Sequence, residues 1–227
     1  MTSEWTLLTV KMVWLYFSLS HQRTADWYVM KKLSLLLTLV LSGCISSSGG
    51  GSRVSEPVVP STTVIELPPQ LIDQLKSQPT IDEQLGILYD KFEPLLDRSD
   101  SLVGVDANED GIRDDIEAFI DALQISESER RAIKQNARYS QEILGHDYSE
   151  KTRENKTKAY EIALKYDKVI ACKDYVGIPL DDAINTSRTI TALTYNTKSR
   201  TMAYLTYNKI LSGLAFTALD SEAKHCE

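Results

Sequence analysis

The chain has 227 residues, with 25 Lys and Arg against 32 Asp and Glu, and a formal net charge of −7. An acidic chain without a basic stripe is repelled by nucleic acid and by anionic lipid head groups, so we expect no nucleic-acid partner. Attraction to cations is the more natural expectation. All three tryptophans, Trp5, Trp14 and Trp27, fall before residue 30, which indicates two unrelated pieces of sequence.

A signal peptide is predicted over residues 30–43. Two lysines follow Met30, and an apolar run then extends from Leu33 to Leu41. This run is well short of the roughly 20 residues that a permanent membrane helix needs. It ends in Leu41-Ser42-Gly43-Cys44, which resembles the lipobox of bacterial lipoproteins.

The resemblance to bacterial lipoproteins implies where the mature chain lies. It implies cleavage before Cys44 and acyl chains such as palmitate on this cysteine, and two or three such chains anchor a protein stably in a membrane. Ile45 stands where aspartate would favour retention at the inner membrane in enterobacterial lipoproteins, so the outer membrane is favoured. We therefore expect a lipid-anchored protein of the bacterial cell envelope.

Residues 1–29 precede this signal peptide and have no evident role. We expect translation to begin at Met30, so that residues 1–29 are an over-extended start and not part of the protein. The alternative is a second apolar segment, because the stretch from Trp5 to Ser18, interrupted by Lys11, could pass for a weak membrane helix. Removal of residues 1–43 leaves 21 basic against 30 acidic residues.

Residues 44–78 are predicted to be the lipidated cysteine and a flexible Ser/Gly/Pro tether. Residues 46–52 are Ser-Ser-Ser-Gly-Gly-Gly-Ser, and four prolines follow by residue 69. Chains of this composition bury too little apolar surface to offset the entropy lost on ordering. They act as linkers, so we expect the tether to hold a folded domain, residues 79–227, away from the lipid surface.

The sequence after the tether predicts an all-α domain, a bundle of five or six helices with one calcium loop. Apolar residues recur at helical spacing, and capping boxes at Thr80 and Ser126 mark two helix starts. The expected helices cover approximately residues 81–93, 113–123, 126–144, 149–171, 180–194 and 198–219.

Two of these helices carry apolar residues that we expect on a buried face. In the 149–171 helix they are Tyr160, Ala163, Leu164 and Ile170. In the 198–219 helix they are Met202, Leu205, Leu211, Leu214 and Leu219. The tyrosines of the C-terminal half are interpreted as partly buried core residues, and the alternative is a face that binds a glycan or a protein partner.

Cys172 and Cys226 are the two cysteines that remain once Cys44 is modified. In an oxidising compartment such a pair most often forms one disulfide, here closing a loop of roughly 50 residues and contributing about 3 to 4 kcal/mol. The alternative is two reduced, buried thiols. The adjacent His225 suggests a metal, but two ligands are too few for a zinc site.

One motif carries chemistry, because residues 106–117 are Asp-Ala-Asn-Glu-Asp-Gly-Ile-Arg-Asp-Asp-Ile-Glu. This run resembles the twelve-residue calcium loop of EF-hands, and also the loops of dockerins and thrombospondin type 3 repeats. Calcium prefers six or seven oxygen ligands, glycine at position 6 permits the sharp turn, and glutamate at position 12 binds through both oxygens. The expected Ca²⁺ ligands of this candidate calcium loop are Asp106, Asn108, Asp110, the Ile112 carbonyl, Asp114 and Glu117.

Three features depart from the EF-hand pattern. Arg113 occupies position 8, where an aliphatic residue usually pairs with a second loop, and the chain has no second loop of this kind. Residues 99–105, with Gly104, form a poor incoming helix. We therefore expect a structural site with an affinity of order 0.1 to 1 mM. The alternative is a solvated acidic run that caps the helix beginning near Arg113, and Asp115 is expected to point outward or to cap this helix.

The sequence offers no nucleophile paired with a base and no buried acid pair, so we do not expect an enzyme. The expected function is that of a calcium-binding, lipid-anchored envelope lipoprotein acting as a structural or interaction module, with an envelope protein or a glycan as partner. Two alternatives stay open: a calcium-dependent adhesion or ligand-binding lipoprotein, and an envelope hydrolase with an unrecognised site. An exposed aromatic patch near the loop would favour the former, and a deep cleft with convergent carboxylates the latter.

Overall fold

The computed structural model describes residues 63–227, and in this range the fold is helical throughout. Seven α-helices, two short 3₁₀ helices and no strand are found there. The elements are α2 (Pro69–Lys76), α3 (Ile81–Phe92), η1 (Glu93–Leu95), α4 (Asp114–Ala122), α5 (Glu127–Leu144), α6 (Arg153–Tyr175), α7 (Leu180–Thr194), α8 (Lys198–Leu211) and η2 (Ala223–His225). The all-α class predicted from the sequence is confirmed. The expectations for residues 1–29, for the signal peptide and for Cys44 lie outside the described residues.

Side-chain caps begin the helices where the sequence predicts them. Thr80 Oγ1 accepts a hydrogen bond from the Glu83 N–H at 3.2 Å and so begins α3. Ser126 and Glu129 form a reciprocal capping box at the start of α5. These bonds satisfy N–H groups that have no partner within the helix, so each helix begins at a defined residue.

Helix α2 lies inside the segment that the sequence predicts to be a flexible tether. Pro69 occupies its first turn, where the missing N–H of proline has no cost. Leu71 and Leu75, four residues apart on one face, are 5% and 0% exposed and join the core. This buried face orders the segment, so the folded domain includes Pro69 and does not begin at residue 79.

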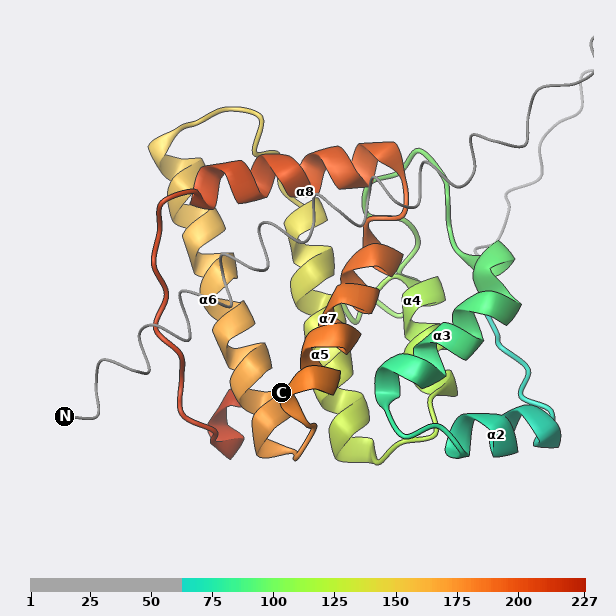
Figure 1. Cartoon of the computed structure of the whole chain (residues 1–227). Coiled ribbons are helices and arrows are strands. Elements are labelled where there is room, and N and C mark those ends of the chain that lie inside the picture. Colours follow the sequence, from blue (N-terminus) through green and yellow to red (C-terminus); the bar gives the residue numbers. More distant parts are fainter. Residues whose placement is uncertain (1–62) are drawn as a thin grey trace, which may run out of the picture. The chain divides into compact units, whose positions relative to one another are not determined.

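Helix α5 lies in the middle of the bundle and packs against α4, α6, α7 and α8 (Figure 1). Helix α8 crosses α5 and α6 at one end of the bundle (Figure 1). The larger apolar core joins α2, α3, α4, α7 and the first half of α5, and a smaller one joins α8 to the last turns of α5 and the first half of α6. No helix within residues 63–227 is long and apolar enough to cross a membrane.

The apolar faces predicted for α6 and α8 are wrong in most positions. On α6, Tyr160, Leu164 and Ile170 are 41%, 40% and 46% exposed, and only Ala163 is buried. The buried face of α6 instead consists mainly of small and β-branched side chains, Ala159, Ile162, Ala163, Val169, Ala171 and Cys172. Small side chains let α6 approach its neighbours closely.

Helix α8 is shorter than predicted. It ends at Leu211, followed by Gly213 with a φ of 88°, a left-handed conformation that glycine adopts readily after a helix. Leu214 therefore lies outside the helix. Met202 and Leu205 are 54% and 49% exposed, so Leu211 is the one residue of the predicted apolar set that is buried.

A disulfide joins Cys172, near the end of α6, to Cys226, with an S–S distance of 2.06 Å and a Cα–Cα distance of 5.0 Å. The predicted pairing is confirmed. The bond fixes the C-terminal segment to α6, and a hydrogen bond of 2.8 Å from Gln135 Nε2 to the His225 carbonyl fixes the same segment to α5.

Candidate calcium site

The first half of the candidate calcium loop folds around the carboxylate of Asp106. Its Oδ1 accepts a hydrogen bond from the Asp110 N–H at 3.1 Å, and its Oδ2 accepts one from the Gly111 N–H at 2.9 Å. Glu109 and Gly111 have positive φ values of 56° and 84°, in the left-handed region that a turn of this sharpness requires. The loop therefore makes the tight turn that glycine at position 6 predicts.

Glu117, in the first turns of α4, lies next to the loop. The Asn108 amide donates to Glu117 Oε2 at 3.0 Å, which joins positions 3 and 12 of the candidate calcium loop. Burial raises the pKa of Asp110, and the negative charges of Glu117 and Asp106 contribute to the rise. The carboxylates at positions 1 and 12 therefore lie close enough to repel the one at position 5, and the charge of Arg138 opposes this effect.

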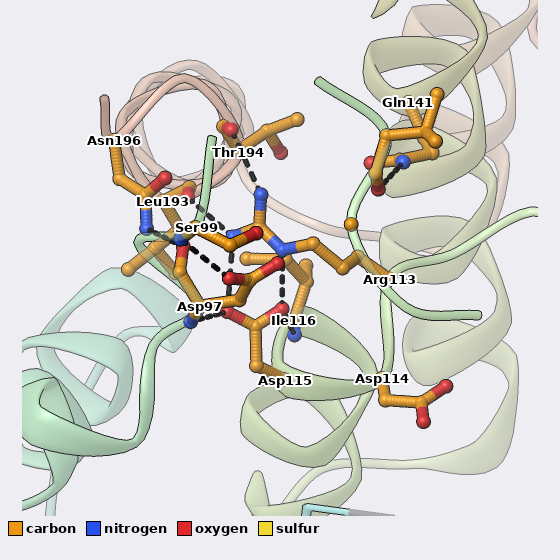
Figure 2. Close-up of polar contacts among 12 residues, drawn as sticks. Asp97, Ser99, Arg113, Asp114, Asp115, Ile116, Gln141, Leu193, Thr194 and Asn196 are labelled. Atoms are coloured by element: carbon orange, nitrogen blue, oxygen red, sulfur yellow. Dashed lines mark hydrogen bonds and ion pairs between the residues drawn. The ribbon is translucent and has the colours of Figure 1, made fainter. Parts of the chain in front are cut away.

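Asp114, at position 9, has an oxygen whose hydrogen-bonding capacity is unused. The residue is 7% exposed, and its Oδ1 accepts a hydrogen bond from the Ala107 N–H at 2.9 Å. Its Oδ2 is shielded from solvent and has no hydrogen-bond partner among the described residues. Figure 2 shows the Asp114 carboxylate pointing away from the neighbouring Arg113–Asp115 pair. A buried carboxylate oxygen without a partner is costly, and a cation would satisfy it.

The candidate ligands are near one another but do not surround a common point as they stand. Within residues 63–227 no group of three or more His, Cys, Asp or Glu side chains is arranged to hold a metal ion. Glu117 Oε1 accepts a hydrogen bond from Lys134 Nζ at 2.7 Å. Burial would raise the pKa of Glu117, but the hydrogen bond and the charge of Lys134 outweigh it and lower this pKa. Lys134 thus holds the residue expected at position 12.

Arg138, a second basic residue of α5, contacts the loop at Asp110. Arg138 Nε donates to the Asp110 carbonyl at 2.9 Å, and its Nη2 lies 3.6 Å from Asp110 Oδ2. The side chain of Ile112 is 1% exposed and belongs to the larger core. The loop is therefore fixed on both sides, by Arg138 and by Ile112.

Arg113, the residue that departs from the EF-hand pattern, is the anchor of the loop. Its guanidinium is buried and contacts Asp115 through two bonds, Nε to Oδ1 at 2.5 Å and Nη2 to Oδ2 at 2.9 Å. It also donates to the carbonyls of Leu193 at 3.1 Å and Thr194 at 3.2 Å (Figure 2). These carbonyls end α7, where the helix dipole favours a positive charge. Asp115 does not point outward, because it is 2% exposed and balances this buried arginine. Its Oδ1 also accepts a hydrogen bond from the Ile116 N–H in the first turn of α4, as the helix-capping alternative expects.

A second buried arginine, Arg200 of α8, holds the segment that leads into the loop. It donates to Asp97 Oδ2 at 2.9 Å and to the carbonyls of Ser101 at 2.8 Å and Leu102 at 3.0 Å. The Asp97 N–H in turn donates to Asp115 Oδ2 at 2.7 Å. Burial would raise the pKa of Asp97, but hydrogen bonds from Ser99 and Arg200 outweigh it and lower this pKa.

The segment leading into the loop is irregular, as the sequence predicts, and it is nevertheless fixed in place. Gly104 has a φ of 72°, and a Cβ at this position would overlap the side chains of Arg113 and Asp97. Sequence reasoning missed Asp97 and Arg200 as part of the site. They are 103 residues apart, and neither belongs to a local motif, so the pattern holds no signal for their contact.

Comparison with protein-family models, with curated proteins and with solved structures finds no match for this chain. Function must therefore be inferred from the chain's own residues. The candidate calcium loop supplies the most specific chemistry among them.

Proposed function

We propose that this chain is a calcium-binding, lipid-anchored lipoprotein of the bacterial envelope that acts as a non-enzymatic structural or interaction module. The calcium proposal rests on the unpartnered, buried Oδ2 of Asp114 in a loop with oxygen ligands at every position that the EF-hand pattern requires. The lipid anchor rests on the sequence Leu41-Ser42-Gly43-Cys44, and the outer membrane on Ile45.

Calcium fits the donor set of the candidate calcium loop. The side chains of Asp106, Asn108, Asp110, Asp114 and Glu117 and the carbonyl of Ile112 would hold the ion. All of these donors are oxygens, which a hard cation prefers over nitrogen or sulfur. The bound ion would add positive charge beside Asp106, Asp110 and Glu117, whose mutual repulsion Lys134 and Arg138 offset only in part.

A structural role is supported by what the loop contacts. The loop is continuous with α4, and Arg113 connects it to the end of α7. Asp115 connects it to Asp97 and thereby to the segment that follows η1. An ion that rigidifies the loop would therefore stabilise the packing of α4 on α7. The proposed partner of such a module is another envelope protein or a glycan, within reach of the tether.

Calorimetric titration of the purified full chain in detergent with CaCl₂ tests the calcium proposal. We expect one site with a dissociation constant of order 0.1 to 1 mM. Asp110→Asn removes one ligand charge and should weaken binding at least tenfold, whereas Asp90→Asn, on the exposed face of α3, should leave binding unchanged. Absence of calcium heat, together with a melting temperature that calcium does not change, would contradict the proposal.

A further inference from the structure

Lys134 forms an ion pair with the glutamate that the proposed site needs most. Its Nζ lies 2.7 Å from Glu117 Oε1 and 2.9 Å from Asp121 Oδ1. The side chains of Lys134 and Glu117 are each 18% exposed, so their contact is partly shielded from solvent. An ion pair in this setting is stronger than one on the open surface, because water screens it less.

This ion pair conflicts with the task of a glutamate at position 12. Such a glutamate gives both oxygens to calcium. Here Oε1 accepts from Lys134 and Oε2 accepts from the Asn108 amide. The positive charge of Lys134 beside Oε1 therefore opposes calcium binding through both oxygens, and the Asn108 side chain must also turn its own oxygen toward the ion.

Asp121 remains an ion-pair partner for Lys134 when Glu117 binds calcium. It lies one turn after Glu117 on α4 and already contacts Lys134. When Glu117 turns toward an ion, Lys134 keeps Asp121 as its partner and does not become an unpaired charge. The exchange therefore breaks one ion pair of two, and the contact between α4 and α5 persists.

Arg138 does not play the same part, although it also reaches the loop from α5. Its Nε donates to the backbone carbonyl of Asp110, its Nη1 pairs with Glu227 at 2.8 Å, and its Nη2 lies 3.6 Å from Asp110 Oδ2, beyond hydrogen-bond distance. The carbonyl of position 5 is not one of the expected calcium ligands. Lys134 is thus the basic residue of α5 that occupies a ligand oxygen at close range.

We propose that Lys134 is an internal cation that competes with calcium for Glu117 and so sets the affinity of the loop. The inference rests on the proposed calcium function. At low calcium Lys134 neutralises Glu117, and at high calcium the ion replaces Lys134 there, while the pair of Lys134 with Asp121 keeps α4 in contact with α5. Replacing the ammonium by a neutral side chain removes the competitor, so calcium binding becomes tighter.

The test is a calcium titration by calorimetry on the full chain and three variants. Lys134→Met should bind calcium roughly tenfold more tightly than the natural chain, because the loss of a partly shielded ion pair and of a nearby positive charge both favour the ion. Lys134→Arg keeps the charge and should bind within about twofold of the natural chain. Lys76→Met removes an exposed lysine at the end of α2 and controls for the change in net charge.

The outcomes separate the two proposals. Equal affinities for the natural chain and Lys134→Met overturn the competition and leave the calcium site standing. If neither the natural chain nor Lys134→Met releases or absorbs heat with calcium, both the competition and the calcium site are overturned. If Lys134→Met fails to fold, as judged by its melting transition in chelator, Lys134→Gln is titrated with the same expectation.

Discussion

Arg113 and Asp115 form an ion pair that is closed off from solvent, with 1% and 2% of their side chains exposed. A buried charge persists when it is paired and its remaining hydrogen-bonding groups are satisfied. Both conditions hold, because Arg113 also reaches the end of α7 and Asp115 also accepts from the Asp97 and Ile116 N–H groups. The pair thus fixes the candidate calcium loop to α7 through side chains of the loop itself.

Removing one partner of this pair should be strongly destabilising. Asp115→Ala leaves the Arg113 guanidinium buried without a counter-charge, and we expect the free energy of unfolding to fall by about 3 to 5 kcal/mol. Urea denaturation followed by circular dichroism measures the change. Asp90→Ala, at an exposed position of α3, should cost less than about 0.5 kcal/mol. A loss below about 1 kcal/mol in Asp115→Ala would show that the pair is not buried as described.

The two glycines Gly104 and Gly86 should respond in opposite directions to replacement by alanine. At Gly104 the φ of 72° strains any other residue, and the new Cβ overlaps Arg113 and Asp97, so we expect a loss of at least about 2 kcal/mol. At Gly86, inside α3, a Cβ would meet no described atom within 4 Å. There alanine should stabilise by about 0.5 to 1 kcal/mol. Thermal melts of Gly104→Ala and Gly86→Ala measure the change in stability of each variant. Equal effects would contradict the close contact of Gly104 with the Arg113 side chain.

Loss of the disulfide should lower stability without abolishing the fold. Cys172 and Cys226 are 54 residues apart, and closing a loop of this size contributes about 3 to 4 kcal/mol. We expect Cys226→Ser to lose this amount in urea denaturation. Reductant should destabilise the natural chain by a similar amount and leave Cys226→Ser unchanged. A natural chain that is insensitive to reductant, with both thiols reactive after unfolding, would contradict the bond.

The buried Lys173 should make stability depend on pH. Burial lowers its pKa from 10.5 to about 7, and its Nζ donates to Asn136 Oδ1 and Ser187 Oγ, each at 2.7 Å. Between these two pKa values the unfolded chain binds a proton that the folded chain has lost, so the free energy of unfolding should rise with pH above about 7.

The expected slope is at most about 1.4 kcal/mol per pH unit, and it should be followed from about pH 7 to 9. Lys173→Met should flatten the dependence. The measurement stops at about pH 9 because tyrosine ionisation begins to matter above it. Burial raises the pKa of Tyr139 and Tyr195 in the folded chain, so at higher pH these tyrosines ionise first in the unfolded chain, which lowers stability. A natural chain with the same flat profile as Lys173→Met would show that Lys173 stays protonated.

The lipid anchor is tested in cells. Bacteria that express the chain should incorporate labelled palmitate into it and retain it in the membrane fraction, and Cys44→Ser should lose both properties. Deletion of residues 1–29 should change neither, because translation is expected to begin at Met30. Labelling that survives in Cys44→Ser would contradict the anchor, and labelling lost on deletion of residues 1–29 would contradict the start.

Local signals explain which parts of this fold could be predicted. Thr80 and Ser126 cap helices through residues three positions away, and Gly111 bonds to Asp106 five positions away, so these interactions are local in the sequence. The anchor at Arg113 could not be predicted, because its carbonyl partners on α7 are 80 and 81 residues away. The predicted face of α6 is wrong for the same reason, since distant helices decide which side of α6 is covered.

The most direct test of the calcium proposal is a crystal structure of the protein grown with about 10 mM CaCl₂, well above the expected dissociation constant, with anomalous diffraction data collected. We expect an anomalous peak surrounded by the oxygens of Asp106, Asp110, Asp114 and Glu117, with Lys134 paired to Asp121 alone. A loop without an anomalous peak, in which Glu117 still accepts from Lys134, would contradict the proposal.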